Sequence, residues 1–523
     1  MLNSKSTCLR QKITIMKNKI IIIFLLFLSA SCSESFLDNA PEDSLVVDNY
    51  YNTNEQVMSA GSPLYGYPWF YFNEKFLICV GDNYSGNSTG TYSDIAQFTL
   101  FSVNQGNQFA TEGWDALYNV IGTANTLLHN LDTKVSADVD EEVIEAVRGE
   151  AYFMRATAYF YLVRTWGAVP IIHDMSQYNA EADVYRNTVE DIYTFILNDY
   201  NNAVSRVPVQ RADSDAGRVI QSACNAMMAK VYLTLKDYTN AKAKAELVIN
   251  SGIHGLLDNY GDVFHPRNNN SRESIFALQW VANQGWGTQN VSQAYLAASP
   301  KLTNAGDGWG TFQPSIDFQN AYEAGDLRRH ETIMEPGDFY PDLVTSEGGY
   351  TVPSAGMTST IAGWRKYVVG SKDEWADVGF MSTNLNTNIM RYAEVLLIHA
   401  EAILGSSAST TDSKALESFN AVRKRAGLAN KASLTFDDIL QERRMELAVE
   451  GKYWYDLARM DRTKALAILS NQERGDYNDG DYNDIITRKV TPSAGDFLLP
   501  IPGSEADLNP LLLEEPVPFD FNN

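Results

Sequence analysis

Apolar residues recur at helical spacing in two long stretches of the first half of the chain. Between residues 114 and 131 they fall three or four positions apart, which predicts an amphipathic helix. The run at 141–167 carries a second stripe, in which several alanines would allow close packing against a neighbouring helix. Gly167 and Pro170 are expected to end this second helix.

Three later stretches indicate that the helices come in pairs. Residues 222–249 follow the small and aromatic spacing of a tetratricopeptide helix pair, and residues 392–405 and 412–428 predict another pair. The TFDD sequence at 435–438 has the side chains of a capping box and is expected to begin a helix over 439–451. Because one pair cannot bury its own apolar face, the pairs are expected to stack into a solenoid.

The segment between residues 258 and 390 lacks this periodicity. It is rich in Gly, Asn, Ser, Thr and aromatic residues, and its tryptophans include Trp286, Trp309, Trp364 and Trp375. So long a stretch without periodicity is unusual in a compact domain, which predicts loops and short strands around a binding face. The predicted fold is mainly α, a solenoid of about four tetratricopeptide-like helix pairs with a loop-rich, partly β, variable ligand-binding half.

These patterns suggest a division of the chain. Residues 32–257 are expected to form an N-terminal region with helix pairs, and residues 258–390 a loop-rich insertion that forms part of the ligand face. Residues 391–523 would supply the C-terminal helices and the tail. We expect 32–523 to form one compact unit, since a chain of 523 residues can bury a large core.

The first 31 residues have the layout of a secretory signal peptide. A short basic segment at 16–19 precedes nine apolar residues at 20–28, a run too short for a permanent membrane span. Met16 is the better-placed start, which would make residues 1–15 an artefact of start-site assignment. Small residues followed by Cys32 resemble a bacterial lipoprotein box, which predicts lipidation of Cys32 and attachment to a membrane through acyl chains alone. The alternative is ordinary signal-peptide cleavage near Ala30 or Ser31 without lipidation, because the leucine of the box stands one place too early.

The charge balance argues against one class of partner. The chain has a formal net charge of −24, and without the basic residues of 1–31 it reaches −29. A surface this acidic repels phosphate backbones, so nucleic-acid binding is not expected.

Cysteine chemistry is sparse. Beyond the presequence and the anchor, the chain has Cys79 in a strand-like run and Cys224 in a helical pattern. We expect two buried free thiols rather than a disulfide, and no CxxC metal spacing is present.

Catalytic motifs give no support for an enzyme. The chain contains neither HExxH nor GxxxxGK[ST], and it has only 6 histidines. Glu442, Glu446 and Glu450 form a like-charge row at helical spacing, which basic residues such as Arg423, Arg425 or Arg443 would have to neutralise. We interpret this row as a structural ion-pair network, with the neighbouring Trp454 and Tyr455 in the core.

One acidic loop could bind a metal ion. The sequence DYNDGDYND at 476–484 offers the oxygens that calcium prefers, with Asp476, Asp479 and Asp481 as candidate ligands. Its glycine comes one place early for an EF-hand, so a solvated acidic turn is the favoured interpretation. Calcium is therefore the one candidate cofactor, and otherwise none is expected.

Aromatic residues within polar, glycine-rich loops are typical of saccharide sites, because sugar C–H faces stack on rings while hydroxyls bond to polar groups. Two stretches of the chain have this composition. The candidate ligand-binding residues are Trp69, Tyr71, Asp82, Asn83 and Tyr84 in the first stretch, and Trp286, Trp309 and Trp364 in the second. Core packing is the alternative for each of them.

A series of blocks in fixed order resembles the SusD/RagB family. They include CSESFLDNAPED after the signal, RGEAYFMRATAYFYLVRTWGAVPII, AKVYLTLKDYTNAKAKAELVINSG, FQNAYEAGDLRRHETI, IMRYAEVLLIHAEAIL, FNAVRKRAGL, ILQERRMELAVEGKYWYDLARM and LLPIPGSEADLNP. Together the blocks extend from Cys32 to about Pro510, nearly the whole mature chain.

The resemblance implies a lipid-anchored, cell-surface outer-membrane protein that is not an enzyme. Such a protein would capture glycan nutrients and pass them to a SusC-like TonB-dependent transporter. It also implies that the N-terminal loops and the middle insertion line the ligand face, which favours Tyr84 and Trp286 by position, whereas Trp309 lies in a segment that resembles family framework. A peptide-binding member of the family and a protein-only tetratricopeptide scaffold are the alternatives.

Overall fold

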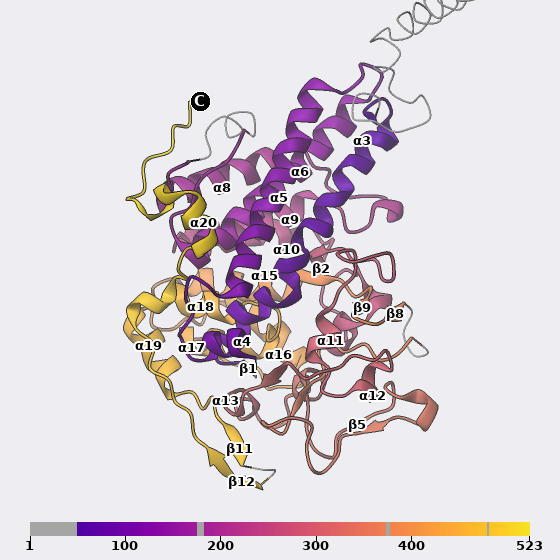
Figure 1. Cartoon of the computed structure of the whole chain (residues 1–523), viewed down its shortest axis with the longest axis vertical. Helices are drawn as coiled ribbons and strands as arrows, with labels where there is room; N and C mark the ends of the chain where they lie inside the picture. Colours follow the sequence, from indigo (N-terminus) through magenta and orange to yellow (C-terminus); the bar gives the residue numbers. More distant parts are fainter. Residues whose placement is uncertain (1–49, 91, 175–182, 373–376, 479–480, 523) are drawn as a thin grey trace, which may run out of the picture.

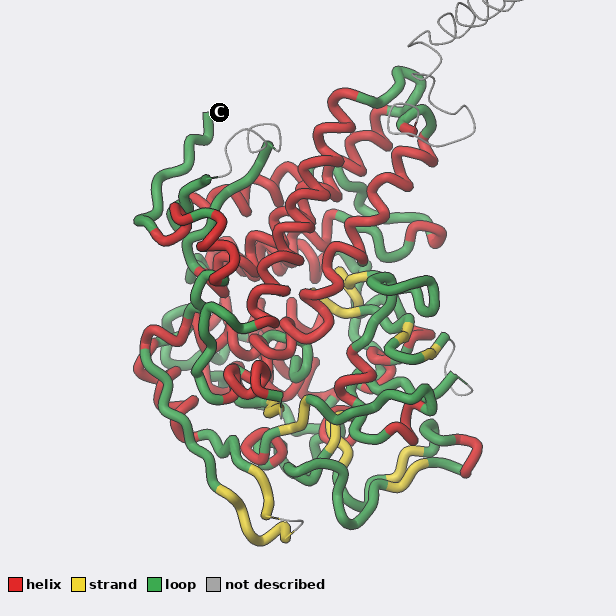
Figure 2. The backbone as a smooth tube through the Cα atoms, viewed as in Figure 1, coloured by secondary structure: helices red, strands yellow, loops and turns green. Residues whose placement is uncertain are grey.

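The computed structural model describes residues 50–90, 92–174, 183–372, 377–478 and 481–522. The predicted signal peptide, the lipidation site Cys32, Trp375 and Asp479 lie outside these ranges. Figures 1 and 2 show a bundle of long helices that occupies one half of the molecule, with loops and short strands gathered at the other end.

The long helices form the predicted tetratricopeptide-like solenoid. They are α5 (Gln108–Thr133), α6 (Glu141–Trp166), α8 (Val189–Val204), α9 (Gln221–Thr234), α10 (Tyr238–Asn250), α15 (Tyr392–Leu404), α16 (Ser413–Arg425) and α17 (Phe436–Glu446). Along the array, α6 packs between α5 and α8, α9 between α8 and α10, and α15 between α10 and the pair α16 and α17. Within the described residues, no helix is both long and apolar enough to cross a membrane.

Most of these helices confirm the predictions, although α5 begins at Gln108, six residues before the predicted start. Helix α6 stops before Gly167, whose φ of +75° suits a residue without a side chain. The capping box of α17 is present, with Thr435 Oγ1 accepting from the Asp438 amide at 3.2 Å and the Asp438 carboxylate accepting from the Thr435 amide at 2.9 Å. However, α17 ends at Glu446, five residues before the expected end, and α8 was not predicted.

The shorter helices complete the chain. They are α3 (Asn54–Gly61), α4 (Ser93–Thr99), α11 (Ser292–Leu296), α12 (Pro300–Thr303), α13 (Ile316–Gln319), α14 (Arg328–Thr332), α18 (Tyr453–Arg459), α19 (Arg462–Asn471) and α20 (Gly503–Leu508). Further 3-10 turns are η2 (Ser62–Tyr65), η6 (Asp213–Asp215), η7 (Gly261–Phe264), η8 (Pro266–Asn268), η9 (Thr345–Glu347), η10 (Ala494–Phe497) and η11 (Pro510–Leu513).

Short antiparallel strand pairs dominate the loop-rich half, as predicted. The pairs are β1 (Ser88–Gly90) with β3 (Phe312–Pro314), β2 (Ser274–Leu278) with β10 (Thr387–Arg391), β4 (Ile333–Met334) with β7 (Gly363–Trp364), β5 (Phe339–Tyr340) with β6 (Tyr350–Thr351), β8 (Val378–Gly379) with β9 (Ser382–Thr383), and β11 (Asp476–Asn478) with β12 (Asp481–Ile486). The register of the first pair places Ser88 opposite Pro314, so the N-terminal segment is joined directly to the middle insertion.

A buried ion-pair network ties the two halves together and confirms the structural interpretation of the glutamate row. Glu442 pairs with Arg328 and Arg423 at 2.7 and 2.9 Å, and Glu446 pairs with Arg391 at 2.9 Å and also with Arg425. Since Arg328 lies in the middle insertion, the network bridges it to α17.

The rest of the row completes the network. Glu450 pairs with Lys366 and Arg391 at 2.6 and 2.8 Å. Arg443 does not neutralise the row but pairs with Asp456 at 2.7 Å and Glu394 at 3.2 Å. Trp454 and Tyr455 are buried beside the network, as expected.

Cys79 and Cys224, the cysteines within the described residues, are buried free thiols, as predicted. Burial raises the pKa of each thiol and keeps it protonated at neutral pH. Cys224 lies in α9, as its helical pattern predicted. Cys79, however, lies in a helical segment and not in a strand.

Candidate ligand-binding face

A continuous helical segment after α3 forms the floor of the candidate site. It comprises the 3-10 turn η3 (Tyr67–Trp69) and two π-helical turns, η4 (Phe72–Phe76) and η5 (Cys79–Asn83). Tyr67 and Tyr71, four residues apart, point outward with exposures of 67% and 43%, whereas the intervening Trp69 and Phe70 are buried. The segment therefore presents a tyrosine pair on one side and packs apolar side chains into the core on the other.

Tyr71 is the one candidate residue named in the first predicted stretch that stays on the surface. Trp69 is fully buried, with its indole N–H donating to the Leu64 carbonyl at 2.9 Å and its ring 5.6 Å from that of Phe72. The prediction of Trp69 as a ligand contact is wrong, because this ring fills the core and has no accessible face.

Asp82, Asn83 and Tyr84 are also buried, and their prediction as ligand contacts is likewise wrong. The carboxylate of Asp82 accepts from the backbone amides of Val449 and Gly451 at 2.9 and 3.0 Å. Burial raises the pKa of Asp82 to about 6, although these amides favour the charged form. These bonds satisfy the turn that follows α17, so Asp82 has a structural role.

The remaining pair of side chains packs around the same turn. The Tyr84 ring lies 4.3 Å from the Trp454 ring, centroid to centroid, and Asn83 is fully buried. Burial raises the pKa of the Tyr84 hydroxyl. Neither side chain reaches the surface.

Trp286 projects from a tight loop opposite the tyrosine pair. The Val281 amide donates to the Thr288 carbonyl at 2.8 Å, which closes the loop, and Gly285 has a φ of +122°. The ring is 54% exposed and rests edge-to-face on Phe70, with centroids 5.1 Å apart. A rigid loop and a buried ring thus hold an accessible indole in place.

Together these side chains enclose a cavity of about 230 Å³. Its walls are the rings of Tyr67, Tyr71 and Trp286, and its far edge is Asn119 and Thr123 of α5. A Cβ atom on Gly287 would lie 2.6 Å from the Tyr67 ring, so this glycine is what allows the ring to close over the loop.

Trp309 forms a second exposed aromatic group near the first. Its ring, 43% exposed, lies 5.4 Å from Tyr295 of α11 and 6.0 Å from Phe380, which is itself 61% exposed. Phe380 occupies the turn of the β8–β9 hairpin, and Ser382 of this hairpin accepts from the Asn283 amide of the Trp286 loop at 2.9 Å. The hairpin therefore links the two aromatic groups, which together we call the candidate face.

Trp364 does not belong to this face. It is fully buried in β7 and its ring lies 5.6 Å from that of Phe318. The prediction of Trp364 as a ligand contact is therefore wrong, because the ring packs inside the insertion. Of the eight candidates, Tyr71, Trp286 and Trp309 present accessible rings.

A partly buried ion pair supports Tyr295, the ring against which Trp309 packs. The Lys75 ammonium pairs with Glu74 at 2.7 Å and lies 4.5 Å from the centre of the Tyr295 ring. The Tyr295 hydroxyl donates to Glu74 at 2.6 Å, and burial together with this bond raises the pKa of Tyr295. The Trp309 platform is thus supported by a fixed hydrogen-bond network.

Two contributors to the face were missed, Tyr67 and Phe380. Tyr67 belongs to the same aromatic run as Tyr71. The spacing of four residues between them could have predicted that both tyrosines lie on the same side of a helical segment. The exposure of Phe380 could not be predicted from the sequence, because this residue lies in a two-residue turn within a segment that has no hydrophobic periodicity.

Sites with other chemistry find little support. The GNSTG sequence at 86–90 has the GxSxG spacing of a hydrolase nucleophile. Ser88, however, is buried within β1, and its hydroxyl donates to the Gln313 carbonyl at 3.1 Å. It does not occupy the exposed strand-to-helix turn that such a nucleophile requires.

The calcium candidate is only partly described. Asp476 accepts from the Ser359 hydroxyl at 2.7 Å, Asp481 bonds within its own turn, and Asp479 lies outside the described ranges. No cluster of three or more potential metal-ligating side chains occurs among the described residues.

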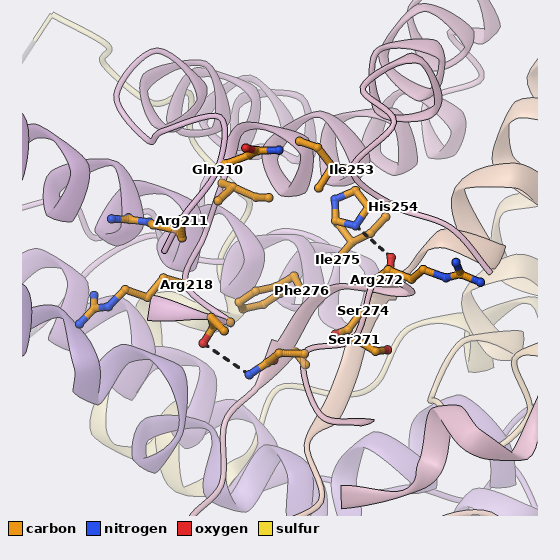
Figure 3. Close-up of a pocket in the computed structure, with 15 residues that line it drawn as sticks. Gln210, Arg211, Arg218, Ile253, His254, Ser271, Arg272, Ser274, Ile275 and Phe276 are labelled. Atoms are coloured by element: carbon orange, nitrogen blue, oxygen red, sulfur yellow. Dashed lines mark hydrogen bonds between the residues drawn. The ribbon is translucent and has the colours of Figure 1, made fainter. Parts of the chain in front are cut away.

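Figure 3 shows a further cavity, of about 360 Å³, between the start of α9 and β2. Arg211 and Arg218, which line it, extend away from its centre and both pair with the buried Glu150, at 2.5 and 2.7 Å. The arginines are therefore used to neutralise an internal carboxylate.

Comparisons with known proteins agree with this architecture. Residues 272–517 match the SusD family, and residues 35–233 match a family described as starch-binding and associating with the outer membrane. A SusD-like protein of Bacteroides ovatus is 35% identical, over 97% of this chain and 99% of the relative.

Solved structures show the same fold. A crystal structure with xylogluco-oligosaccharide is 32% identical, with a TM-score of 0.82 over 89% of this chain and 100% of that one. A laminarin-binding SusD-like protein is 25% identical, with a TM-score of 0.70 over 88% of this chain and 98% of that one. Sequence and fold agree along nearly the whole length, and the chain therefore belongs to the SusD family.

Proposed function

We propose that this protein binds a glycan on the face formed by Tyr71, Trp286 and Trp309. The observation that carries the proposal is the cavity walled by the exposed rings of Tyr71 and Trp286, with the exposed Trp309 ring linked to it through the β8–β9 hairpin. Stacking of sugar C–H faces on such rings, with amide and hydroxyl groups nearby, is the recognition chemistry this arrangement suits. Relatives described with xylogluco-oligosaccharide and laminarin support a glycan over a peptide.

We further propose that the protein works as a lipid-anchored, cell-surface protein of the outer membrane. Cys32 would carry the acyl chains, and the bound glycan would pass to a SusC-like TonB-dependent transporter without chemical change. The description of the matching family as associating with the outer membrane supports this location, and the description of relatives as binding proteins supports a role without catalysis.

Calorimetric titration with neutral oligosaccharides tests the binding proposal. Trp286→Ala and Trp309→Ala are each expected to weaken binding by about tenfold or more. Stacking of a sugar ring on an indole should contribute more than about 1.4 kcal/mol to the binding free energy, which corresponds to that factor. Tyr185→Ala is the matched control, because Tyr185 is 44% exposed but lies next to the C-terminal tail. Unchanged affinity in both tryptophan variants would refute the proposed face.

A further inference from the structure

A second hollow lies directly beside the aromatic cavity, along the outer surface of α5. It has a volume of about 570 Å³ and lies between α5, Ala60 of α3 and Tyr51. Asn119 and Thr123 line both this hollow and the cavity below Trp286. The two spaces therefore adjoin each other, and we call the second one the α5 trough.

A row of polar, uncharged side chains runs along the trough, beside apolar lining residues that include Ile121, Leu127 and Ile172. Asn119, Thr123, Thr126 and Asn130 follow one another at intervals of four, three and four, which places them on one face of α5. From the first to the last the row extends about 16 Å at the helical rise, longer than a single sugar ring.

The functional groups of this row suit hydroxyl-bearing ligands. Thr123 and Thr126 donate to the helix carbonyls of Asn119 and Gly122 at 2.7 and 2.8 Å, so their hydroxyl oxygens remain available as acceptors. Asn130 donates to the Tyr51 hydroxyl at 3.1 Å, which fixes an aromatic wall over the end of the row.

Charge distinguishes this space from other cavities of the described structure. Neither the trough nor the aromatic cavity has a charged residue in its lining, although 20% of the chain is charged. Three other cavities are lined by arginine, lysine, aspartate or glutamate. An acidic protein that keeps one long surface free of charge can accept an uncharged polymer there without desolvating ions.

We propose that the α5 trough is a second subsite, which holds the continuation of an uncharged saccharide chain whose end is stacked at Trp286. This inference rests on the proposed glycan function. It adds that the ligand is an uncharged saccharide longer than a single sugar ring, and that its chain runs across α5. Sugar rings would lie over Gly122, with their hydroxyls bonded to the Asn and Thr side chains on either side.

Gly122 offers a sharp test. A Cβ atom on Gly122 would meet nothing within 4 Å, so a larger side chain there points into open space and leaves the fold intact. Gly122→Gln would fill the trough with an uncharged side chain of good helix propensity, and Thr133→Gln, at an exposed position of α5 outside the linings of both cavities, is the matched control. Both variants should unfold at or above the wild-type temperature.

Titration with a length series of neutral glucan or xyloglucan oligosaccharides gives the readout. Wild type and Thr133→Gln are expected to bind long oligosaccharides more tightly than short ones. Gly122→Gln should weaken the long ones by about tenfold and leave the short ones unchanged. Trp286→Ala should weaken all lengths. An oligosaccharide of equal length with uronic acid groups should bind less tightly than the neutral one.

The outcomes separate the two proposals. If Gly122→Gln binds long chains like wild type, or weakens short and long chains equally, the trough is not a separate subsite, while a loss in Trp286→Ala still upholds the glycan site. Equal binding of the acidic oligosaccharide overturns the uncharged ligand class. If Trp286→Ala has no effect on any saccharide, the proposed function itself fails.

Discussion

Trp286 and Trp69 lie a few side chains apart and have opposite roles. Trp69 is fully buried, with its indole N–H bonded inside the core, whereas more than half of Trp286 is open to solvent. Phe70 separates them and supports the exposed ring. The role of each tryptophan follows from the side of the supporting segment on which it lies.

This contrast predicts opposite effects of two alanine substitutions. Trp69→Ala should lower the free energy of unfolding by about 3 to 5 kcal/mol, because it opens a cavity in a packed core. Trp286→Ala should cost less than about 1 kcal/mol, since most of its surface is already hydrated, but should weaken glycan binding. Urea denaturation and calorimetric titration of both variants measure the two effects. A stable Trp69→Ala protein with impaired binding would reverse the assignment.

Which aromatics face outward could not be predicted from the sequence. Tyr84 and Trp364 lie in glycine-rich sequence like that around Trp286, and irregular backbone has no period from which to infer the direction of a side chain. Their burial depends on partners far along the chain, such as Trp454 for Tyr84. Only Tyr67 and Tyr71, on a helical segment, carried a spacing that could have shown their common side.

Among the elements, long helices were the most predictable. The stripes of α5, α6, α15 and α16 and the cap of α17 were read correctly, because these helices bury one face over three or more turns. Helix α8 was missed, although Ile192, Phe195, Ile196 and Tyr200 have the same spacing and are buried. Cys79 was placed in a strand because a short apolar run does not distinguish strand from helix.

Two backbone segments lie in direct contact where η5 meets the turn after α17. A Cβ atom on Gly81 would lie 2.0 Å from the Cα atom of Gly451, which itself has a φ of +68°. Two glycines are thus required for these backbones to touch, and the amides around Gly451 reach Asp82 only because of this contact.

Two glycine substitutions should therefore change stability in opposite directions. Gly81→Ala should lower the free energy of unfolding by about 3 kcal/mol, because its methyl group would collide with the backbone of Gly451, which cannot move aside. Gly122→Ala should stabilise it by about 0.5 to 1 kcal/mol, because alanine loses less conformational freedom in a helix. Chemical denaturation midpoints give the comparison, and wild-type stability of Gly81→Ala would show that the contact is absent in solution.

At the scale of the whole molecule, stability in acid depends on the buried ion pairs. Burial alone would raise the pKa of Glu446, but Arg425, Arg391 and Arg328 outweigh it and lower that pKa to about 2. A carboxylate whose pKa falls on folding stabilises the native state above its unfolded pKa, near 4.5. That contribution is lost as the pH falls from about 4.5 towards 2.

Glu446→Gln isolates this contribution. Glutamine resembles the protonated side chain, so the variant should be less stable than wild type by about 3 kcal/mol at neutral pH. The difference should shrink as the pH is lowered from about 4.5 to about 3. Denaturation curves across this range test it, and a difference independent of pH would contradict the lowered pKa.

The overall charge gives a second prediction at this scale. With a net charge of −24, the protein should bind any charged ligand in a salt-dependent manner. An uncharged glycan should bind with a Kd that changes by less than about twofold between low salt and about 0.5 M NaCl. Titrations at both salt concentrations distinguish it from a charged peptide, whose affinity should respond strongly.

The attachment of Asp82 to residues 449 and 451 has a consequence for the order of events during synthesis. Residues 67–83, which carry Tyr67 and Tyr71, are made early, but the backbone groups that anchor their end arrive more than 360 residues later. Arg474, which donates to the carbonyls of Asn83, Tyr84 and Thr99, arrives later still. A nascent chain emerging from the ribosome or crossing a membrane therefore has no finished binding surface, and a polypeptide truncated before residue 449 should be unable to hold its cargo.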